Sequence, residues 1–345
     1  MLRGQTLQDL AKTLEDQQTI KDDFIVNTRM VEMNIGSEGV NLQVPGKGTF
    51  NMNHICHNQV ADKLGIPIKY YDRMMDEEPS LLVENVNRWM HKDPVRRMFR
   101  TLGTTARAFL SDRYLPLDNI DLAEAVVPTL VEQQAVIRSA QLTDSRMYIQ
   151  ASLPSLQGEV KKGDVVQSGI IVSNSEVGMG SLRVEPFFFR LVCKNGMIAQ
   201  ESIRKHHLGQ SLGTGEGTWN LLTDKTRQLT NEAFFGQLKD VVAGSFSPEY
   251  FNTILNKFRE TTGEEIEGDL EKVIDITTSR FGLGKDERNS VLKNLINGGD
   301  LSRWGLANAV TRVGHTTESY DRCVDLERFG GKIITEDAVW RDLTN

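Results

Sequence analysis

The sequence predicts an α+β fold: a mostly antiparallel sheet crossed by one helix and followed by a helical C-terminal region. Between residues 96 and 192, segments typical of strands follow one another, mostly along connections too short for parallel crossovers. One helical segment interrupts them at 119–134, where Asn119 is a suitable N-cap. After residue 204 the apolar residues recur at helical spacing, so the strands are expected to be complete by that point.

Three parts are expected along the chain. They are an N-terminal helix and hairpin over 1–52, an α+β core over 53–208 and a helical region over 218–345. The glycine-rich stretch 209–217 is the predicted boundary between the last two parts. The expected helices before residue 96 are at 6–22, at 53–64 with Asn53 as the N-cap, just after Pro67 and at 78–92. Hairpin strands are expected at 24–35 and 40–44.

The remaining elements are predicted from apolar periodicity and turn residues. The core strands are expected at 98–102, 106–110, 136–142, 146–153, 169–173 and 181–192, with a charged turn at Gly158–Gly163. Lys194-Asn195-Gly196 is a strong hairpin-turn signal. The C-terminal helices are expected at 219–242, 248–261, 269–280, 286–295, 302–313 and 319–329, with Gly330-Gly331 as the C-cap of the last.

Composition limits the classes of protein to consider. The 345 residues carry a net charge of −7, which argues against a surface that is basic throughout but allows a local basic patch. Three widely separated cysteines, an odd number, predict a reducing compartment. The N-terminal stretch lacks the apolar core of a secretory signal, and no run approaches the ~20 apolar residues of a membrane span. A soluble, cytoplasmic protein without membrane association is expected.

A basic and aromatic segment lies between Arg88 and Tyr114. It holds seven lysines and arginines against two acidic residues, with phenylalanines and a tyrosine between them. Positive charge and aromatic faces are what a single-stranded nucleic acid needs for phosphate neutralisation and base stacking. The candidate contacts are Arg97, Arg100, Arg107, Arg113 and Tyr114. The alternative is a solvated strand edge whose arginines pair with local acids.

A polar cluster interrupts the apolar hairpin formed by the strands at 169–173 and 181–192. Asn174, Ser175 and Glu176 precede a Gly178-Met179-Gly180 tip, which is suited to close approach of a backbone. Asn174, Ser175, Gly178 and Gly180 are therefore further candidate contacts. Arg204 and Lys205 follow the hairpin and extend the same basic track, unless they are only a solvated linker.

Cofactor and catalytic motifs are weak. His54-x-Cys56-His57 has ligands that zinc accepts, but no second ligand pair follows, and adjacent positions diverge on the expected helix. The Gly178-Met179-Gly180 tip opens a strand and not a helix, so it is no nucleotide-binding fingerprint. Glu176 and Glu185 could hold Mg²⁺ as a pair, or could instead form ordinary ion pairs with arginines. No catalytic residue, metal or other cofactor is predicted.

Four separated passages carry a resemblance to a known family. They are Arg107–Asn119, Ser168–Ile198, Arg204–Gly209 and Ser319–Ile333. In these the chain resembles the phage/plasmid-like protein family, a domain family of unknown function found on phages, plasmids and integrated elements. The resemblance implies a mobile-element protein of α+β architecture in the cytoplasm of a host, and it implies no reaction. Family members accompany DNA-maintenance and anti-restriction genes, which favours a role in DNA metabolism.

The leading hypothesis is a non-catalytic protein that binds or anneals single-stranded DNA and whose helical region forms a homo-oligomer. One alternative is a protein-interaction module that inhibits a host defence complex, for which the acidic run between Glu260 and Glu271 is suited. The other is a metal-dependent nuclease that uses Glu176 and Glu185.

Overall fold

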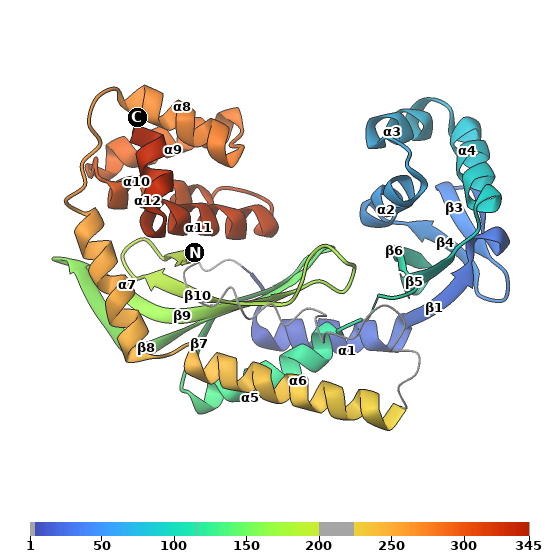
Figure 1. Ribbon diagram of the computed structural model, residues 1–345, viewed down its shortest axis with the longest axis horizontal. Helices are drawn as coiled ribbons and strands as arrows, with labels where there is room; N and C mark the ends of the chain where they lie inside the picture. The colour runs from blue at the N-terminus through green and yellow to red at the C-terminus, as the bar shows by residue number, and fades with distance from the viewer. Residues whose placement is uncertain (1–3, 115, 200–223, 345) are drawn as a thin grey trace.

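A computed structural model describes residues 4–114, 116–199 and 224–344, and in these ranges it confirms the α+β prediction. Two sheets form, where the sequence had predicted strands of one sheet. Figure 1 shows the first sheet and its three helices on one side of the molecule, and the second sheet between two groups of helices. The predicted boundary at 209–217 and the first residues of the helix predicted at 219–242 lie outside the described residues.

The first sheet has six strands in the order β1-β5-β6-β4-β3-β2. They are β1 (Lys21–Asn27), β2 (Glu32–Gly36), β3 (Gly39–Val44), β4 (Gly48–Met52), β5 (Arg96–Leu102) and β6 (Thr105–Ser111). All neighbours are antiparallel except β4 and β6. Because strands from 21–52 and 96–111 share this sheet, the boundary expected after residue 52 lies inside it.

The strand predicted at 24–35 is wrong as a single element. A short 3₁₀ helix, Thr28–Met30, divides it into β1 and β2, which lie at opposite edges of the sheet. The Asn27 side chain accepts the Arg29 N–H, and the Thr28 hydroxyl donates to the Met90 carbonyl. Polar side chains that bond to the backbone favour such a local turn over a continuing strand.

Helices α2 (His54–Leu64), α3 (Ile68–Glu77) and α4 (Pro79–Lys92) cover one face of the first sheet and share its core. Asn53 caps α2 by accepting the Cys56 N–H, as predicted. Gly65 ends the helix in the left-handed conformation, with φ of 68°. The opposite face of this sheet is turned toward the second sheet, and there the candidate site lies.

The second sheet has five antiparallel strands in the order β11-β10-β9-β8-β7. They are β7 (Val136–Leu142), β8 (Met147–Lys161), β9 (Asp164–Asn174), β10 (Arg183–Arg190) and β11 (Asn195–Ile198). Two predicted turns are shorter than expected, because β8 continues through Gly158 to Lys161, and Asn195 and Gly196 already belong to β11.

Helices cover both faces of the second sheet (Figure 1). Ile170 and Val172 of β9 pack with α1 (Leu7–Ile20), α5 (Asn119–Glu132) and α6 (Asp224–Gly244). Ile171 points to the other face and packs with α11 (Tyr320–Thr335). This alternation is the period of two that a strand buried on both faces requires.

The remaining helices build a separate apolar core against the far end of the second sheet. They are α7 (Pro248–Thr261), α8 (Leu270–Phe281), α9 (Lys285–Gly298), α10 (Arg303–Val313) and α12 (Asp337–Thr344). Helix α12 was not predicted. The prediction that Gly330-Gly331 ends the preceding helix is wrong, because α11 continues through both glycines to Thr335.

Packing explains the two glycines inside α11. A Cβ atom on Gly331 would lie 1.8 Å from the carbonyl oxygen of Ile198, and one on Gly330 would lie 3.0 Å from that of Ala307. The glycines therefore let α11 approach β11 and α10 more closely than any side chain would allow.

Substituting Gly331→Ala is expected to lower the free energy of unfolding by about 1–3 kcal/mol, because the methyl group forces α11 away from β11. Gly236→Ala is the matched control, since no atom lies within 4 Å of the Cβ position on exposed Gly236 in α6. Alanine there is expected to stabilise the protein by up to about 1 kcal/mol. Urea titrations followed by circular dichroism measure both effects. Equal stability of Gly331→Ala and the parent would contradict the close-packing argument.

Candidate functional site

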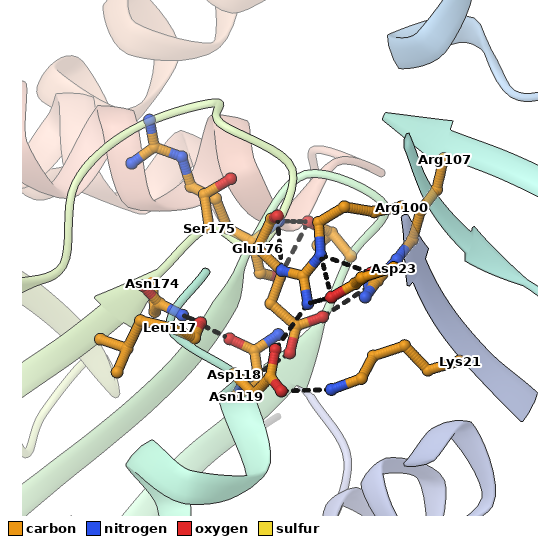
Figure 2. A network of polar contacts seen from close by, with 12 residues as sticks. Lys21, Asp23, Arg100, Arg107, Leu117, Asp118, Asn119, Asn174, Ser175 and Glu176 are labelled. Atoms are coloured by element: carbon orange, nitrogen blue, oxygen red, sulfur yellow. Dashed lines mark hydrogen bonds and ion pairs between the residues drawn. The ribbon is translucent and has the colours of Figure 1, made fainter. Parts of the chain in front are cut away.

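The Asn174-Ser175-Glu176 cluster lies where β9 ends, between the two sheets (Figure 2). The Asn174 side-chain amide donates to the Leu117 carbonyl and to the Asn119 side chain, both at 2.9 Å. The Ser175 hydroxyl accepts the Met179 N–H at 2.9 Å. These contacts hold the segment that leads into α5 and the Gly178–Gly180 tip, so the unusual polar residues have a structural role.

Glu176 joins the start of α5 to the first sheet. One carboxylate oxygen accepts the Asn119 N–H at 2.6 Å, and the other lies 2.5 Å from Nη1 of Arg107. Asp118, the N-cap residue of α5, makes no side-chain capping bond. Glu176 therefore supplies an acceptor for a backbone N–H group in the first turn of the helix. The Glu176 residue is only 6% exposed.

Arg100 is the centre of the polar network in Figure 2. Its side chain is fully buried and donates to both carboxylate oxygens of Asp23, to Asp118 at 2.6 Å and to the Glu176 carbonyl at 2.8 Å. Burial alone would lower the pKa of Arg100, but Asp23 and Asp118 raise it above the ordinary value. Burial acts to raise the pKa of Asp118, yet Lys21 and Arg100 hold it below its usual range.

The Gly178-Met179-Gly180 tip packs against the first sheet and against Arg146, which directly precedes β8. Tyr114 donates its hydroxyl to the Ser175 carbonyl at 3.0 Å, and burial raises the pKa of Tyr114. Gly178 has φ of +73°, and a Cβ there would lie 2.7 Å from the Leu110 side chain. Arg146 donates to the Met179 carbonyl. The close approach expected at this tip is therefore to the protein's own side chains.

Arg107 of β6 is buried but only partly paired. Its residue is 9% exposed, and Nη1 faces Glu176. Its Nε and Nη2 atoms are buried and have no hydrogen-bond partner among the described residues. Unpaired buried donors are rare and costly, which makes this side of the guanidinium a candidate ligand contact.

Two adjoining cavities lie next to this network. The junction cavity has a volume of ≈ 250 Å³, and the second cavity has ≈ 480 Å³. Both are lined by Leu142, the last residue of β7, and by Thr143, Asp144 and Ser145 in the connection to β8. The junction cavity is further lined by Gln17, Asn53, Leu102, Thr105, Arg107, Asn119, Arg146, Glu176 and Val177. The second cavity extends past His54 to the start of α11 at Tyr320 and Asp321.

Comparison with known families places the network within a recognised segment of the chain. Residues 107–234 match the family described as domain of unknown function (DUF932). The resemblance noted in the sequence is confirmed over this DUF932 segment. It contains Arg107, the start of α5 and the whole Asn174–Gly180 cluster, whereas Asp23 and Arg100 lie outside it. No curated protein and no solved structure matches the chain.

The expected nucleic-acid contacts do not form one surface. Arg100 and Arg107 lie in the interior and not on a solvated strand edge, because Arg100 is paired with Asp23 and Asp118 and Arg107 with Glu176. Arg97 lies on the opposite face of β5, with its guanidinium 5.8 Å from the Phe109 ring centroid. Arg113 is exposed. Arg204 and Lys205, like the rest of the RKHHLG passage, lie outside the described residues, although within the DUF932 segment.

Of the two alternatives for Glu176 and Glu185, the structure shows ion pairs with arginines and not a carboxylate pair. Glu185 pairs in register with Ile171, and its carboxylate binds Arg328 of α11, with the shortest contact at 2.6 Å. Glu176 lies beyond the end of β9 and is held by Arg107. Within the described ranges, no group of three or more histidine, cysteine or acidic side chains could hold a metal ion. Nor is any helix there long and apolar enough to cross a membrane.

Sequence reasoning missed several residues of the junction cavity. Thr143, Ser145 and Arg146 were interpreted only as a strand connection and the start of the next strand, and Asn53 and Asn119 only as helix caps. The available signal was their density of hydrogen-bonding side chains in turns. That signal identifies a polar turn without identifying what lies opposite it in space.

Proposed function

We propose that the protein binds single-stranded nucleic acid without acting on it chemically, at the junction cavity and the adjoining second cavity. The observation that carries the proposal concerns Arg107, which lines a polar cavity and whose buried Nε and Nη2 atoms have no acceptor among the described residues. These two donors project side by side, which suits the paired oxygens of a phosphate group.

The lining of both cavities supports a single strand over a duplex. Amide and hydroxyl groups of Asn53, Asn119, Thr143 and Ser145 can bond to base edges and sugars. In a duplex those base edges are paired and stacked, whereas an unpaired base can enter a concave site. The resemblance to a family found on phages and plasmids agrees with a ligand from DNA metabolism.

The charge of the site predicts a weak salt dependence. Arg107 and Arg146 line the junction cavity together with the acidic residues Asp144 and Glu176, and the protein as a whole carries a net charge of −7. With about two phosphates neutralised, the log–log slope of affinity against salt is expected to be about −1.4 for a single strand. A protein that tracks many phosphates would give a much steeper slope.

Fluorescence anisotropy with a labelled oligonucleotide, titrated from about 50 to about 200 mM salt, tests this proposal. Arg146→Gln is expected to weaken binding and to reduce the slope by about 0.7. Arg96→Gln is the control, because Arg96 is an exposed arginine of β5 that lines neither cavity. Absence of binding at the lowest salt, or equal loss in both variants, would remove the proposal.

A further inference from the structure

The side of Arg107 that has no partner among the described residues has a defined chemistry. In a guanidinium, Nε and Nη2 form a two-donor edge, and Arg107 keeps this edge while Nη1 is occupied by Glu176. Four other arginines show which group the edge binds in this protein, because each places Nε and Nη2 on one carboxylate. They are Arg100 on Asp23, Arg190 on Asp164, Arg322 on Glu287 and Arg328 on Glu185.

The expected acceptor at Arg107 is therefore a group with two negatively charged oxygens. Within the described residues no carboxylate reaches the edge, although Glu176 is bound to the neighbouring nitrogen. With no such acceptor in the described part of the chain, we assign this role to a ligand that reaches into the junction cavity. In the junction cavity, Asn119 can offer the ligand its side-chain amide. The backbone N–H of Asn119 already donates to Glu176.

Burial decides which kind of phosphate fits. Arg107 is 9% exposed, so an oxygen reaches its two-donor edge only from a group that projects into the cavity. A phosphodiester inside a strand is flanked by sugars on both sides and presents its oxygens along the chain. A phosphomonoester at the end of a strand projects freely and has three terminal oxygens.

We infer that the junction cavity binds a terminal phosphomonoester on the Nε and Nη2 edge of Arg107, with the rest of the ligand extending toward the second cavity. The inference rests on the proposed function and specifies the part of the strand that is recognised. The same chemistry is present in a free nucleoside monophosphate, so the experiment must distinguish a strand end from a nucleotide.

The test compares one oligonucleotide sequence in three forms, with a 5′-phosphate, with a 3′-phosphate or with hydroxyl groups at both ends, labelled on an internal base. We expect one phosphorylated form to bind about tenfold more tightly than the hydroxyl form, which corresponds to about 1.4 kcal/mol of binding free energy. Equal affinity for all three forms would overturn the inference and leave the proposed function standing. Absence of binding to any form would overturn the proposed function.

Equilibrium dialysis with a nucleoside monophosphate provides the second arm. If the nucleotide binds and no oligonucleotide does, the phosphomonoester site stands while the proposed strand binding is overturned. If neither the nucleotide nor any oligonucleotide binds, both are overturned.

Two variants connect the effect to Arg107. Arg107→Lys keeps the positive charge beside Glu176 but removes the two-donor edge, so the preference for a phosphorylated end is expected to disappear. Glu176→Gln removes the carboxylate beside the guanidinium and is expected to tighten binding of the phosphorylated form several-fold. Thermal melting checks that both variants fold. A retained tenfold preference in folded Arg107→Lys, or weaker binding in folded Glu176→Gln, would overturn the inference.

Discussion

Replacing Arg100 with methionine is expected to lower the free energy of unfolding by about 3–5 kcal/mol, the cost of breaking a buried ion pair on one side. Methionine fills a similar length but donates no hydrogen bond. Asp23 and Asp118 then lose a buried positive partner, and the Glu176 carbonyl loses its donor. Because these acceptors belong to β1, the start of α5 and the end of β9, the contact between the two sheets is expected to loosen.

Arg96→Gln is the matched control for this change. Arg96 lies four residues before Arg100 on the same face of β5, but it is exposed. Its replacement is expected to change stability by less than about 0.5 kcal/mol. Urea unfolding gives the free energies, and the denaturant dependence reports whether unfolding stays cooperative. A loss in Arg100→Met no larger than in Arg96→Gln would show that the network contributes little to stability.

Arg100 also shows how far the sequence could predict the site. The period of two along β5 places Arg96, Met98 and Arg100 on one face. Nothing local could place Asp23 beside Arg100, because 77 positions separate them. Arginine on a strand is usually solvated, so the sequence favoured a surface contact with phosphate, whereas the tertiary fold buries the charge among acids.

Local patterns predicted most elements because each depends on residues close in sequence. Asn53 as a cap and the strand at 169–173, which lies within β9, are examples. The errors arose where distant contacts override a local signal. Gly330 and Gly331 are typical of a helix end, but the approach of Ile198 and Ala307 keeps them inside α11. The Asn174–Glu176 cluster was correctly selected as unusual, and only the fold showed that it holds the start of α5.

Glu327 of α11 is the residue for which the largest pH effect is expected. It is 6% exposed, and its carboxylate accepts a hydrogen bond from the Gln150 side chain at 2.7 Å. Burial raises the pKa of Glu327 from 4.5 to about 7, against the opposing effects of Gln150, Arg328 and the Gly196 N–H. The folded protein therefore holds a proton in a pH range where the unfolded chain has already released it.

This difference fixes the sign of the pH dependence. The contribution of Glu327 is most favourable below pH 4.5 and is lost as the pH rises through about 7. The total loss is of the order of 3 kcal/mol. Glu327→Gln keeps a carbonyl oxygen for Gln150 and needs no proton, so its free energy of unfolding lacks this loss. We expect the variant to be more stable than the parent by about 3 kcal/mol at about pH 8, and by little at about pH 5.

The quantity to measure is the difference in the free energy of unfolding between variant and parent, because the contributions of the other titrating groups cancel in it. Asp118, Glu287, Asp300 and Asp337 all have lowered pKa values and give the opposite trend, with stability falling as the pH falls. Urea unfolding of both proteins across this range gives the difference directly. Glu132→Gln, at the exposed end of α5, is the control and is expected to show no such trend. A difference for Glu327→Gln that does not grow with pH would mean that the folded protein accommodates the Glu327 carboxylate in its charged form, through Gln150, Arg328 and the Gly196 N–H.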